Sequence, residues 1–213
     1  MSTETQEQLE NKEITSRYRT LLRSLPDSTD SDDKKLIRKA FNLAKDAHAE
    51  VRRKSGEPYI FHPIEVATIV AKEIGLGPVS VASALIHDVV EDSEYTLEDI
   101  ERLFGDEIAR IIDGLTKISG VFDQNISMQA ENFRKMLLTI SDDIRVIIIK
   151  LADRLHNMRT MESMPQHKQL KIASETLYLY APLAHRIGLY NIKTELEDLS
   201  LKYTEPEVYR DIA

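Results

Sequence analysis

The residues best suited to chemistry in this chain stand together at positions 87–92, where the sequence reads HDVVED. If this run is helical, with about 3.6 residues per turn, His87 lies over Glu91 and Asp88 lies over Asp92. His87 and Asp88 carry metal-binding groups, and the two acids one turn later can accept a proton. This arrangement suits hydrolysis by a metal-activated water. A His-Asp dipeptide recurs by chance, so the interpretation requires further ligands elsewhere in the chain.

Two more residues complete a candidate ligand set. His62 stands at an expected helix start, and Asp153 stands on a long apolar helix. Each has a plain alternative: His62 can cap its helix or make a buried hydrogen bond, and Asp153 can pair with Arg154 at the surface. Together with His87 and Asp88 they offer two neutral and two anionic ligands. Such a set suits a divalent cation such as manganese, with positions left for water and substrate.

The elements that must position these residues are expected to be helices, so the predicted fold class is all-α. The expected helices cover about 6–24, 31–47, 63–74, 78–92, 97–104, 106–118, 128–140 and 146–158, with two more after Pro165 on either side of Gly188. A loop is expected at 119–127. The β-branched run at 146–149 would also suit a buried strand. We interpret it as helix because apolar positions continue beyond it without a turn signal.

Two helix starts carry recognisable capping residues. Ser31 is the expected N-cap of the second helix, with Asp32 and Asp33 in the first turn, where acids favour the helix dipole. Thr96 and Asp99 resemble a capping box, and Gly105 can end the short helix that they begin.

Composition limits the classes of protein that remain. The 213 residues are 42% hydrophobic and 30% charged and include no cysteine, so a metal would have to be held by His, Asp or Glu. The polar, acidic N-terminus does not resemble a secretory signal, and the apolar run at 146–149 is far shorter than the ~20 residues of a membrane span. A cytoplasmic protein without membrane association is therefore expected.

The charge of the chain disfavours nucleic acid as a partner but not a small phosphorylated ligand. A formal net charge of −8 disfavours direct, non-specific binding to nucleic acid, which requires a large cationic surface. Local basic residues at 52–54, at Lys150 and at Arg154 still suit a small phosphorylated ligand.

Beyond these positions, longer stretches resemble a known family. His62, His87-Asp88 and Asp153 are similar to the H…HD…D pattern of HD-domain phosphohydrolases, which are helical bundles. The surrounding runs resemble the hydrolase domain of RelA/SpoT-type stringent-response enzymes: RKSGEPYI from 53, HDVVED from 87, and VIIIKLADRLHNMRT from 146. The resemblance covers roughly residues 35–205.

The resemblance implies a reaction and a set of roles. The reaction is Mn²⁺-dependent removal of the 3′-pyrophosphate of ppGpp or pppGpp, which gives GDP or GTP. Glu91 and Asp92 would take the proton of the attacking water and orient it. Family members that only synthesise the nucleotide have lost residues of this motif, and here they are present.

The same resemblance assigns a substrate site. Arg53 and Lys54 would contact the guanine and its phosphates, with Ser55 beside them, and Asn157 and Thr160 would line the base pocket. From its position before Asp153, Lys150 could neutralise the departing pyrophosphate. The alternative for the basic run at 52–54 is a solvated cationic turn.

The resemblance also predicts an organisation: an N-terminal helical extension at 1–30, a hydrolase core at 31–163, and C-terminal helices at 164–213. Long family members carry a (p)ppGpp synthetase domain after the hydrolase, and the chain ends before one could fit. It is therefore expected to be part of a longer enzyme or a small stand-alone hydrolase. The run APLAHRIG at 181–188 is similar to the long enzymes and favours the former.

Other functions share these features. A different HD phosphohydrolase would use the same metal site on dNTPs, cyclic nucleotides or nucleoside monophosphates. A non-catalytic module that senses the alarmone would need the pocket but not the acids, so Glu91 and Asp92 argue against it. A helical scaffold without a ligand would leave the convergence of Asp88 and Asp153 unexplained.

Overall fold

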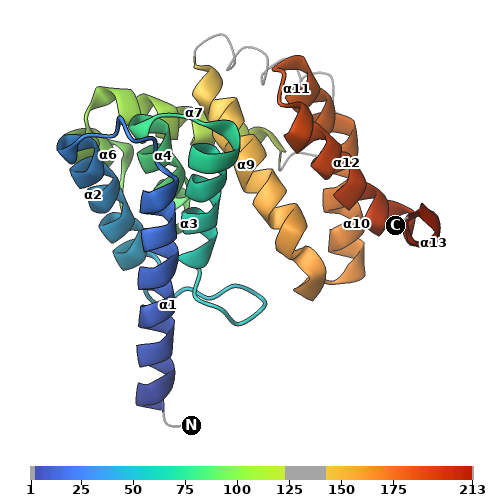
Figure 1. The fold of residues 1–213 in the computed structure, drawn as a ribbon, viewed down its shortest axis with the longest axis horizontal. Coiled ribbons are helices and arrows are strands. Elements are labelled where there is room, and N and C mark those ends of the chain that lie inside the picture. The colour runs from blue at the N-terminus through green and yellow to red at the C-terminus, as the bar shows by residue number, and fades with distance from the viewer. Residues whose placement is uncertain (1–2, 123–142, 213) are drawn as a thin grey trace. The chain divides into compact units, whose positions relative to one another are not determined.

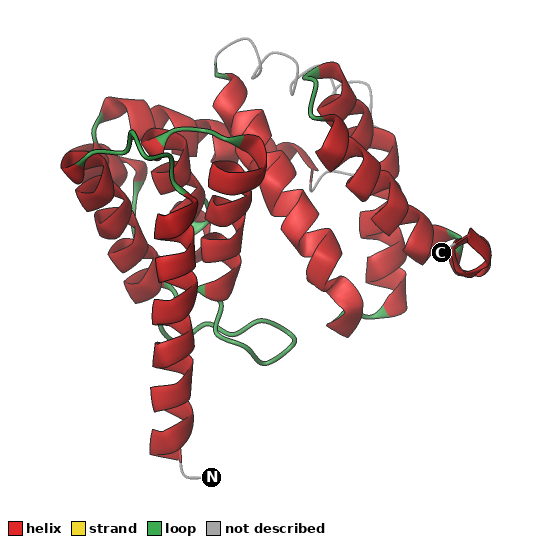
Figure 2. Ribbon diagram, in the orientation of Figure 1, coloured by secondary structure: helices red, strands yellow, loops and turns green. Residues whose placement is uncertain are grey.

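The structure, a computed structural model, describes residues 3–122 and 143–212, and within them the side chains of 6–118 and 143–212. In these ranges every regular element is a helix (Figure 2). An isolated antiparallel bridge between Arg52 and Pro58 is the nearest approach to a strand pair there. The predicted all-α fold is confirmed.

The chain divides into two compact units, Met1–Ile149 and Lys150–Ala213. The division falls within one continuous helix, α9 (Ile144–Thr160). Among the described residues, no helix combines the length and apolar composition that crossing a bilayer requires.

The first unit is built around a short, deeply buried helix. Its elements are α1 (Thr3–Ser24), α2 (Ser31–Ala47), α3 (Phe61–Thr68), the π-helical segment η1 (Ile69–Ile74), α4 (Pro78–Leu85), α5 (Val89–Asp92), α6 (Leu97–Phe104), α7 (Asp106–Phe122) and the start of α9 (Figure 1). Helix α4 packs against α2, α3 and α7. Its residues from Ser80 to Leu85 are all buried, as expected for a helix that is apolar nearly all round. The segment that follows α4 is therefore held by the centre of the core.

Helix α1 covers α3 and the loop that precedes it. Its buried residues Ile14, Tyr18 and Leu21 recur at helical spacing. The Tyr18 ring stacks on Phe41 of α2, with 4.0 Å between ring centroids. Arg17 donates to Glu65 of α3 at 3.1 Å, so apolar and charged contacts both anchor this helix.

The helix ends agree with the sequence in one case and differ in two. The Thr96–Asp99 capping box of α6 is confirmed. The N-cap of α2 is Asp30 rather than Ser31, because the Asp30 carboxylate accepts the backbone N–H groups of residues 32 and 33. Helix α7 continues to Phe122, so residues 119–122 are helical where a loop was expected; residues 123–142, with the rest of that loop and the expected helix at 128–140, lie outside the described part.

The β-branched run Val146–Ile149 belongs to helix α9, which confirms the helical interpretation. All four residues are buried. The Gly114 position on α7 faces Val146, because a Cβ added to Gly114 would lie 2.8 Å from a Val146 methyl carbon. The two helices therefore pack backbone against side chain at this point.

The second unit contains the rest of α9, η3 (Met161–Ser163), α10 (Gln166–Glu175), the π-helical η4 (Thr176–Tyr180), α11 (Ala181–Arg186), α12 (Tyr190–Thr204) and α13 (Pro206–Ile212). Helix α12 packs against α10, η4 and α11. The expected pair of helices on either side of Gly188 is confirmed, and Gly188 has a φ of +81°, which glycine adopts without strain.

Candidate active site

The His-Asp motif lies in a turn between two short helices, not within one continuous helix as the sequence suggested. Helix α4 ends at Leu85 and α5 begins at Val89. The Nδ1 atom of His87 lies 2.8 Å from the carbonyl oxygen of Ala84, the group that would accept the amide of Asp88 in a continued helix. The side chain thus competes with the backbone ladder. Helical bonds resume at the amide of Asp92, which donates to the carbonyl of Asp88 at 2.9 Å.

This hydrogen bond also selects the nitrogen of His87 that suits a metal. A neutral imidazole that donates from Nδ1 carries its lone pair on Nε2. The Nε2 atom lies 3.0 Å from Oδ2 of Asp88. His87 is 2% exposed, so this lone pair is directed into the protein interior.

His62 stands beside the same carboxylate. Its Nε2 atom lies 3.7 Å from Oδ2 of Asp88, and its ring meets the His87 ring edge-on, with 5.2 Å between centroids. The capping alternative for His62 is wrong, because the N-cap position of α3 is Ile60 and makes no side-chain cap.

Three predicted ligands of the first unit lie together. The Nε2 atoms of His62 and His87 lie 3.7 and 3.0 Å from Oδ2 of Asp88. Both histidines are buried. Two imidazole nitrogens and a carboxylate form a donor set that fits a divalent cation of hard or borderline character. The fourth predicted ligand, Asp153, belongs to the second unit and is also buried.

Asp153 is oriented by its own helix. Its Oδ1 atom accepts the amide nitrogen of Asn157 at 2.6 Å, and its Oδ2 atom lies 3.0 Å from Nζ of Lys150. The alternative of a surface pair with Arg154 is wrong, because Asp153 is 7% exposed and Arg154 bonds to Tyr180 at 3.0 Å. Two of the residues predicted to contact substrate therefore also fix this carboxylate.

The two candidate proton acceptors are the last two residues of the motif. Glu91 and Asp92 are exposed on α5, one turn after the His-Asp pair. Although the Asp92 side chain reaches solvent, partial desolvation of its carboxyl and the negative charge of Asp88 raise its pKa, while His48 and His87 act in the opposite direction. A carboxylate with a raised pKa is a better proton acceptor near neutral pH.

The predicted phosphate-binding residues of the first unit lie on the loop between α2 and α3. Arg53 is half-buried, whereas Lys54 and Ser55 are exposed. The loop is closed by the bridge between Arg52 and Pro58. Three polar side chains are thus presented on a compact turn.

The predicted base-pocket residues of the second unit lie near the end of α9. Asn157 and Thr160 are both half-buried. The hydroxyl of Thr160 donates to the carbonyl of His156 at 2.9 Å, which leaves its oxygen lone pairs as the acceptor face of the group.

Tyr59 is the residue of this site that sequence reasoning missed. Its hydroxyl donates to Oδ2 of Asp88 at 2.6 Å. Its ring stacks on the buried His48, at 4.7 Å between centroids, and meets His62 edge-on at 5.6 Å. A tyrosine between Pro58 and Ile60 looks like a core residue, and only the fold brings it to a carboxylate 29 residues later. The family-like run from 53 contained it without indicating this role.

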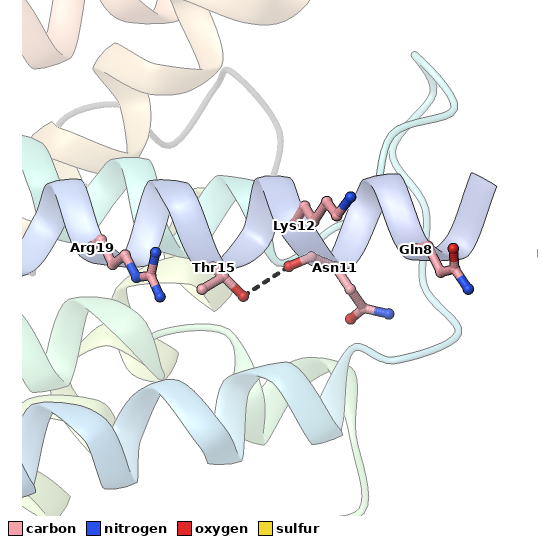
Figure 3. A pocket seen from close by; sticks show the side chains of 5 residues that line it. All are labelled: Gln8, Asn11, Lys12, Thr15 and Arg19. Carbon is pink, nitrogen blue, oxygen red and sulfur yellow. Dashed lines mark hydrogen bonds between the residues drawn. The ribbon is translucent and has the colours of Figure 1, made fainter. Parts of the chain in front are cut away.

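Two hollows of the first unit lie away from the His-Asp motif. One of about 580 Å³ follows the surface of α1 and is lined by Gln8, Asn11, Lys12, Thr15 and Arg19 (Figure 3). The Thr15 hydroxyl there donates to its own helix, at the carbonyl of Asn11. Another, of about 790 Å³, lies among α1, the end of α2 and the loop at 49–58. Neither contains a predicted metal ligand.

The chain matches a known protein family over most of its length. A family described as "HD domain" matches residues 40–190. The chain belongs to the HD-domain family. The match includes every residue discussed above as a metal ligand or proton acceptor.

Individual relatives of this HD domain are hydrolases or synthetases of guanine alarmones. The chain is 52% identical over 178 residues to the Synechocystis "Probable guanosine-3′,5′-bis(diphosphate) 3′-pyrophosphohydrolase", covering 83% of the chain and 23% of that protein. It is 49% identical over 182 residues to the Escherichia coli "Bifunctional (p)ppGpp synthase/hydrolase SpoT", covering 85% of the chain and 26% of that protein. The chain thus spans about a quarter of the length of these relatives.

A solved structure agrees with this relationship. It is described as "A metazoan ortholog of SpoT hydrolyzes ppGpp and plays a role in starvation responses". The similarity has a TM-score of 0.52 and 26% identity, and covers 84% of the chain and 96% of that protein. The resemblance of the HD domain to the RelA/SpoT-type hydrolase domain is confirmed.

Proposed function

We propose that this HD domain hydrolyses the 3′-pyrophosphate of ppGpp or pppGpp, giving pyrophosphate and GDP or GTP, and acts in the stringent response. The observation that carries the proposal is the group formed by His62, His87 and Asp88, together with the exposed acids of α5 that follow it in the sequence. The names of the relatives supply the substrate class.

Mn²⁺ is the proposed cofactor, with His62, His87, Asp88 and Asp153 as its ligands. When bound, such a cation polarises a phosphoryl group and lowers the pKa of a nearby water. The hydrogen bond from His87 Nδ1 to Ala84 keeps Nε2 as the coordinating nitrogen. The Tyr59 hydroxyl holds Oδ2 of Asp88 in place.

Glu91 and Asp92 are the carboxylates proposed to act on the attacking water. One of them accepts a proton from the attacking water while the other orients that water, and the proton is later returned to the 3′ oxygen of the nucleotide. The reaction consumes one water, forms a P–O bond to it and breaks the P–O bond to the ribose. The exposure of both side chains on α5 gives water access to them.

Six polar residues are proposed to bind the substrate: Arg53, Lys54, Ser55, Lys150, Asn157 and Thr160. Arg53 stacks its guanidinium plane on the guanine, and Lys54 contacts the phosphates, with Ser55 beside them. Asn157 and Thr160 contact the base.

Lys150 is proposed to bind the pyrophosphate. Its ammonium lies 3.0 Å from Asp153. Once Asp153 serves as a metal ligand, Lys150 no longer has to balance its charge, and the ammonium can serve the substrate instead.

The wider organisation is proposed on the same basis. Residues 1–30 form a helical extension, 31–163 the hydrolase core, and 164–213 the helices that lead toward a covalently linked synthetase domain. We propose a cytoplasmic location, with no direct nucleic-acid or membrane partner.

A nucleotide panel tests the proposal. Purified protein is incubated with Mn²⁺ and ppGpp, pppGpp, GDP, dGTP, cyclic GMP or GMP, and the products are separated by ion exchange. Release of pyrophosphate and GDP from ppGpp, with no turnover of nucleotides that lack a 3′-pyrophosphate, is the expected result. Comparable turnover of dGTP or cyclic GMP would replace the alarmone by another nucleotide substrate. Binding of ppGpp without turnover would replace the enzyme by a sensing module.

A further inference from the structure

Arg52 precedes the proposed nucleotide-contacting residues in the sequence, but its side chain bonds to helix α1 instead. Its guanidinium donates to both carboxylate oxygens of Glu10 on α1, each at 2.9 Å. The same guanidinium donates to the carbonyl oxygen of Gly56 at 2.9 Å. The forked geometry of the pair with Glu10 is the strongest and most directional form of an Arg–carboxylate contact.

The loop held in this way is a tight turn. The amide of Arg53 donates to the carbonyl of Glu57 at 2.9 Å, and the amide of Gly56 donates to the carbonyl of Arg53 at 2.8 Å. Gly56 has a φ of +89°, which a residue with a Cβ adopts only with strain. Arg52 therefore bonds the far side of the turn that displays Arg53, Lys54 and Ser55.

Helix α1 provides a firm base for this contact. Its buried residues Ile14 and Tyr18 pack in the core of the first unit, and Arg17 bonds to Glu65 of α3. Between α1, the end of α2 and the loop lies the hollow of about 790 Å³, which Glu10, Arg52 and Gly56 all line. Since open space lies here instead of packed apolar side chains, the ion pair ties the loop to the helix across that space.

We propose that Glu10 and Arg52 are positioning residues that fix the 53–55 turn for nucleotide binding. This inference rests on the proposed function. A loop that is already ordered loses less conformational entropy when a ligand binds, so its ligand binds more tightly. Helix α1, outside the proposed hydrolase core, would thereby contribute to substrate affinity.

The first measurement uses the protein without nucleotide. Amide hydrogen exchange is followed at Arg53 and Gly56 in the unaltered protein, in Glu10→Gln and in Arg52→Gln. Both variants are expected to exchange faster at these two amides. Glu13→Gln is the matched control, because Glu13 lies on the same helix but pairs with Arg17 at 2.7 Å. Unchanged exchange in Glu10→Gln would overturn the proposed tether.

The second measurement is the steady-state kinetics of ppGpp hydrolysis. Glu10→Gln is expected to raise KM about threefold to fivefold, as the loss of an exposed ion pair allows, with kcat within about twofold. In the Arg52→Gln background the Glu10→Gln change should add nothing, since the partner is already gone. Faster exchange with unchanged KM, or additive effects in the double variant, would overturn the positioning role. If the unaltered protein does not turn over ppGpp, the proposed function fails, and the exchange data still decide the tether.

Discussion

The Tyr59 hydroxyl, at the scale of single residues, stabilises the position of a metal-type carboxylate from outside the ligand set. It donates to Asp88 Oδ2 at 2.6 Å, and its ring is fixed by the buried His48. Groups that orient ligands in this way typically change metal affinity about 10- to 100-fold when they are removed.

Tyr59→Phe, which removes this hydroxyl and keeps the ring, is therefore expected to weaken Mn²⁺ binding about tenfold. Calorimetric titration of metal-stripped protein measures the affinity without any turnover. Tyr178→Phe is the control, because Tyr178 is 75% exposed. Equal Mn²⁺ affinity in the Tyr59 variant and the unaltered protein would show that the hydroxyl does not position Asp88.

Glu91→Gln tests the assignment of the proton acceptor. The amide keeps the size of the side chain but cannot take a proton, so kcat for ppGpp hydrolysis should fall at least about 100-fold. The Kd for ppGpp should stay within a few fold. Glu94→Gln, an exposed neighbour after α5, is the matched control. Survival of turnover in Glu91→Gln would move the role to Asp92 or to another group.

The sequence predicted this site to the extent that its residues carry a recognisable motif. His62, His87 and Asp88 could be named from residue type and family-like runs, and they do come together. Tyr59 could not, since its partner lies far along the chain and its hydroxyl contact depends on tertiary structure. The hydrogen bond from Asn157 to Asp153, in addition to the proposed contact of Asn157 with the base, was not predicted either.

At the scale of elements, the sequence predicted which helices exist better than it predicted where they break or change type. Apolar spacing identified α2, and the continuation of apolar residues identified α9. The break at 86–88 was missed because a side-chain bond to Ala84, rather than Gly or Pro, interrupts the helix. The π-helical segments Ile69–Ile74 and Thr176–Tyr180 were missed because their sequences keep ordinary helical patterns.

The cap of α2 gives a prediction with a defined pH dependence. Backbone N–H groups of Asp33 and Asp32 donate to the Asp30 carboxylate and hold its pKa below the usual value of 3.8. Asp30→Ala should lower Tm by about 2–4 °C at pH 7, whereas Asp30→Asn, which still caps, should change it less.

The sign of this effect follows from the lowered pKa. The carboxylate contributes its stability above the unfolded-state pKa, and loses it as the pH falls through the lower folded-state pKa. The Tm difference between unaltered protein and Asp30→Ala should therefore shrink in strongly acidic buffer. Calorimetry across the pH range measures it, and a difference that grows toward low pH would contradict the capping role.

The packing of α7 on α9 gives a second prediction at this scale. Gly114→Ala should gain about 1 kcal/mol of helix propensity but place a Cβ 2.8 Å from the Val146 methyl carbon, in a core where overpacking costs about 1–3 kcal/mol. Net destabilisation by about 1 kcal/mol is expected in urea unfolding. In the Val146→Ala background the same change should be neutral or stabilising. A destabilisation that persists there would mean that Val146 is not the obstacle.

The whole chain carries a net charge of −8, so attraction of a highly anionic nucleotide must come from local groups. Arg53 and Lys54 in the first unit and Lys150 in the second meet that need in our proposal. The chain also spans 26% of the Escherichia coli relative, whose name joins a (p)ppGpp synthase to the hydrolase. The two-unit division within α9 was not visible in the sequence, because the helix runs through it without interruption.

The measurement that tests the central claim most directly is ppGpp hydrolysis by metal-stripped protein, with and without added Mn²⁺. We expect release of GDP and pyrophosphate that depends on Mn²⁺, and loss of both metal binding and turnover in Asp153→Asn. Full hydrolysis by metal-stripped protein in the presence of a chelator, or full activity of Asp153→Asn, would contradict the claim.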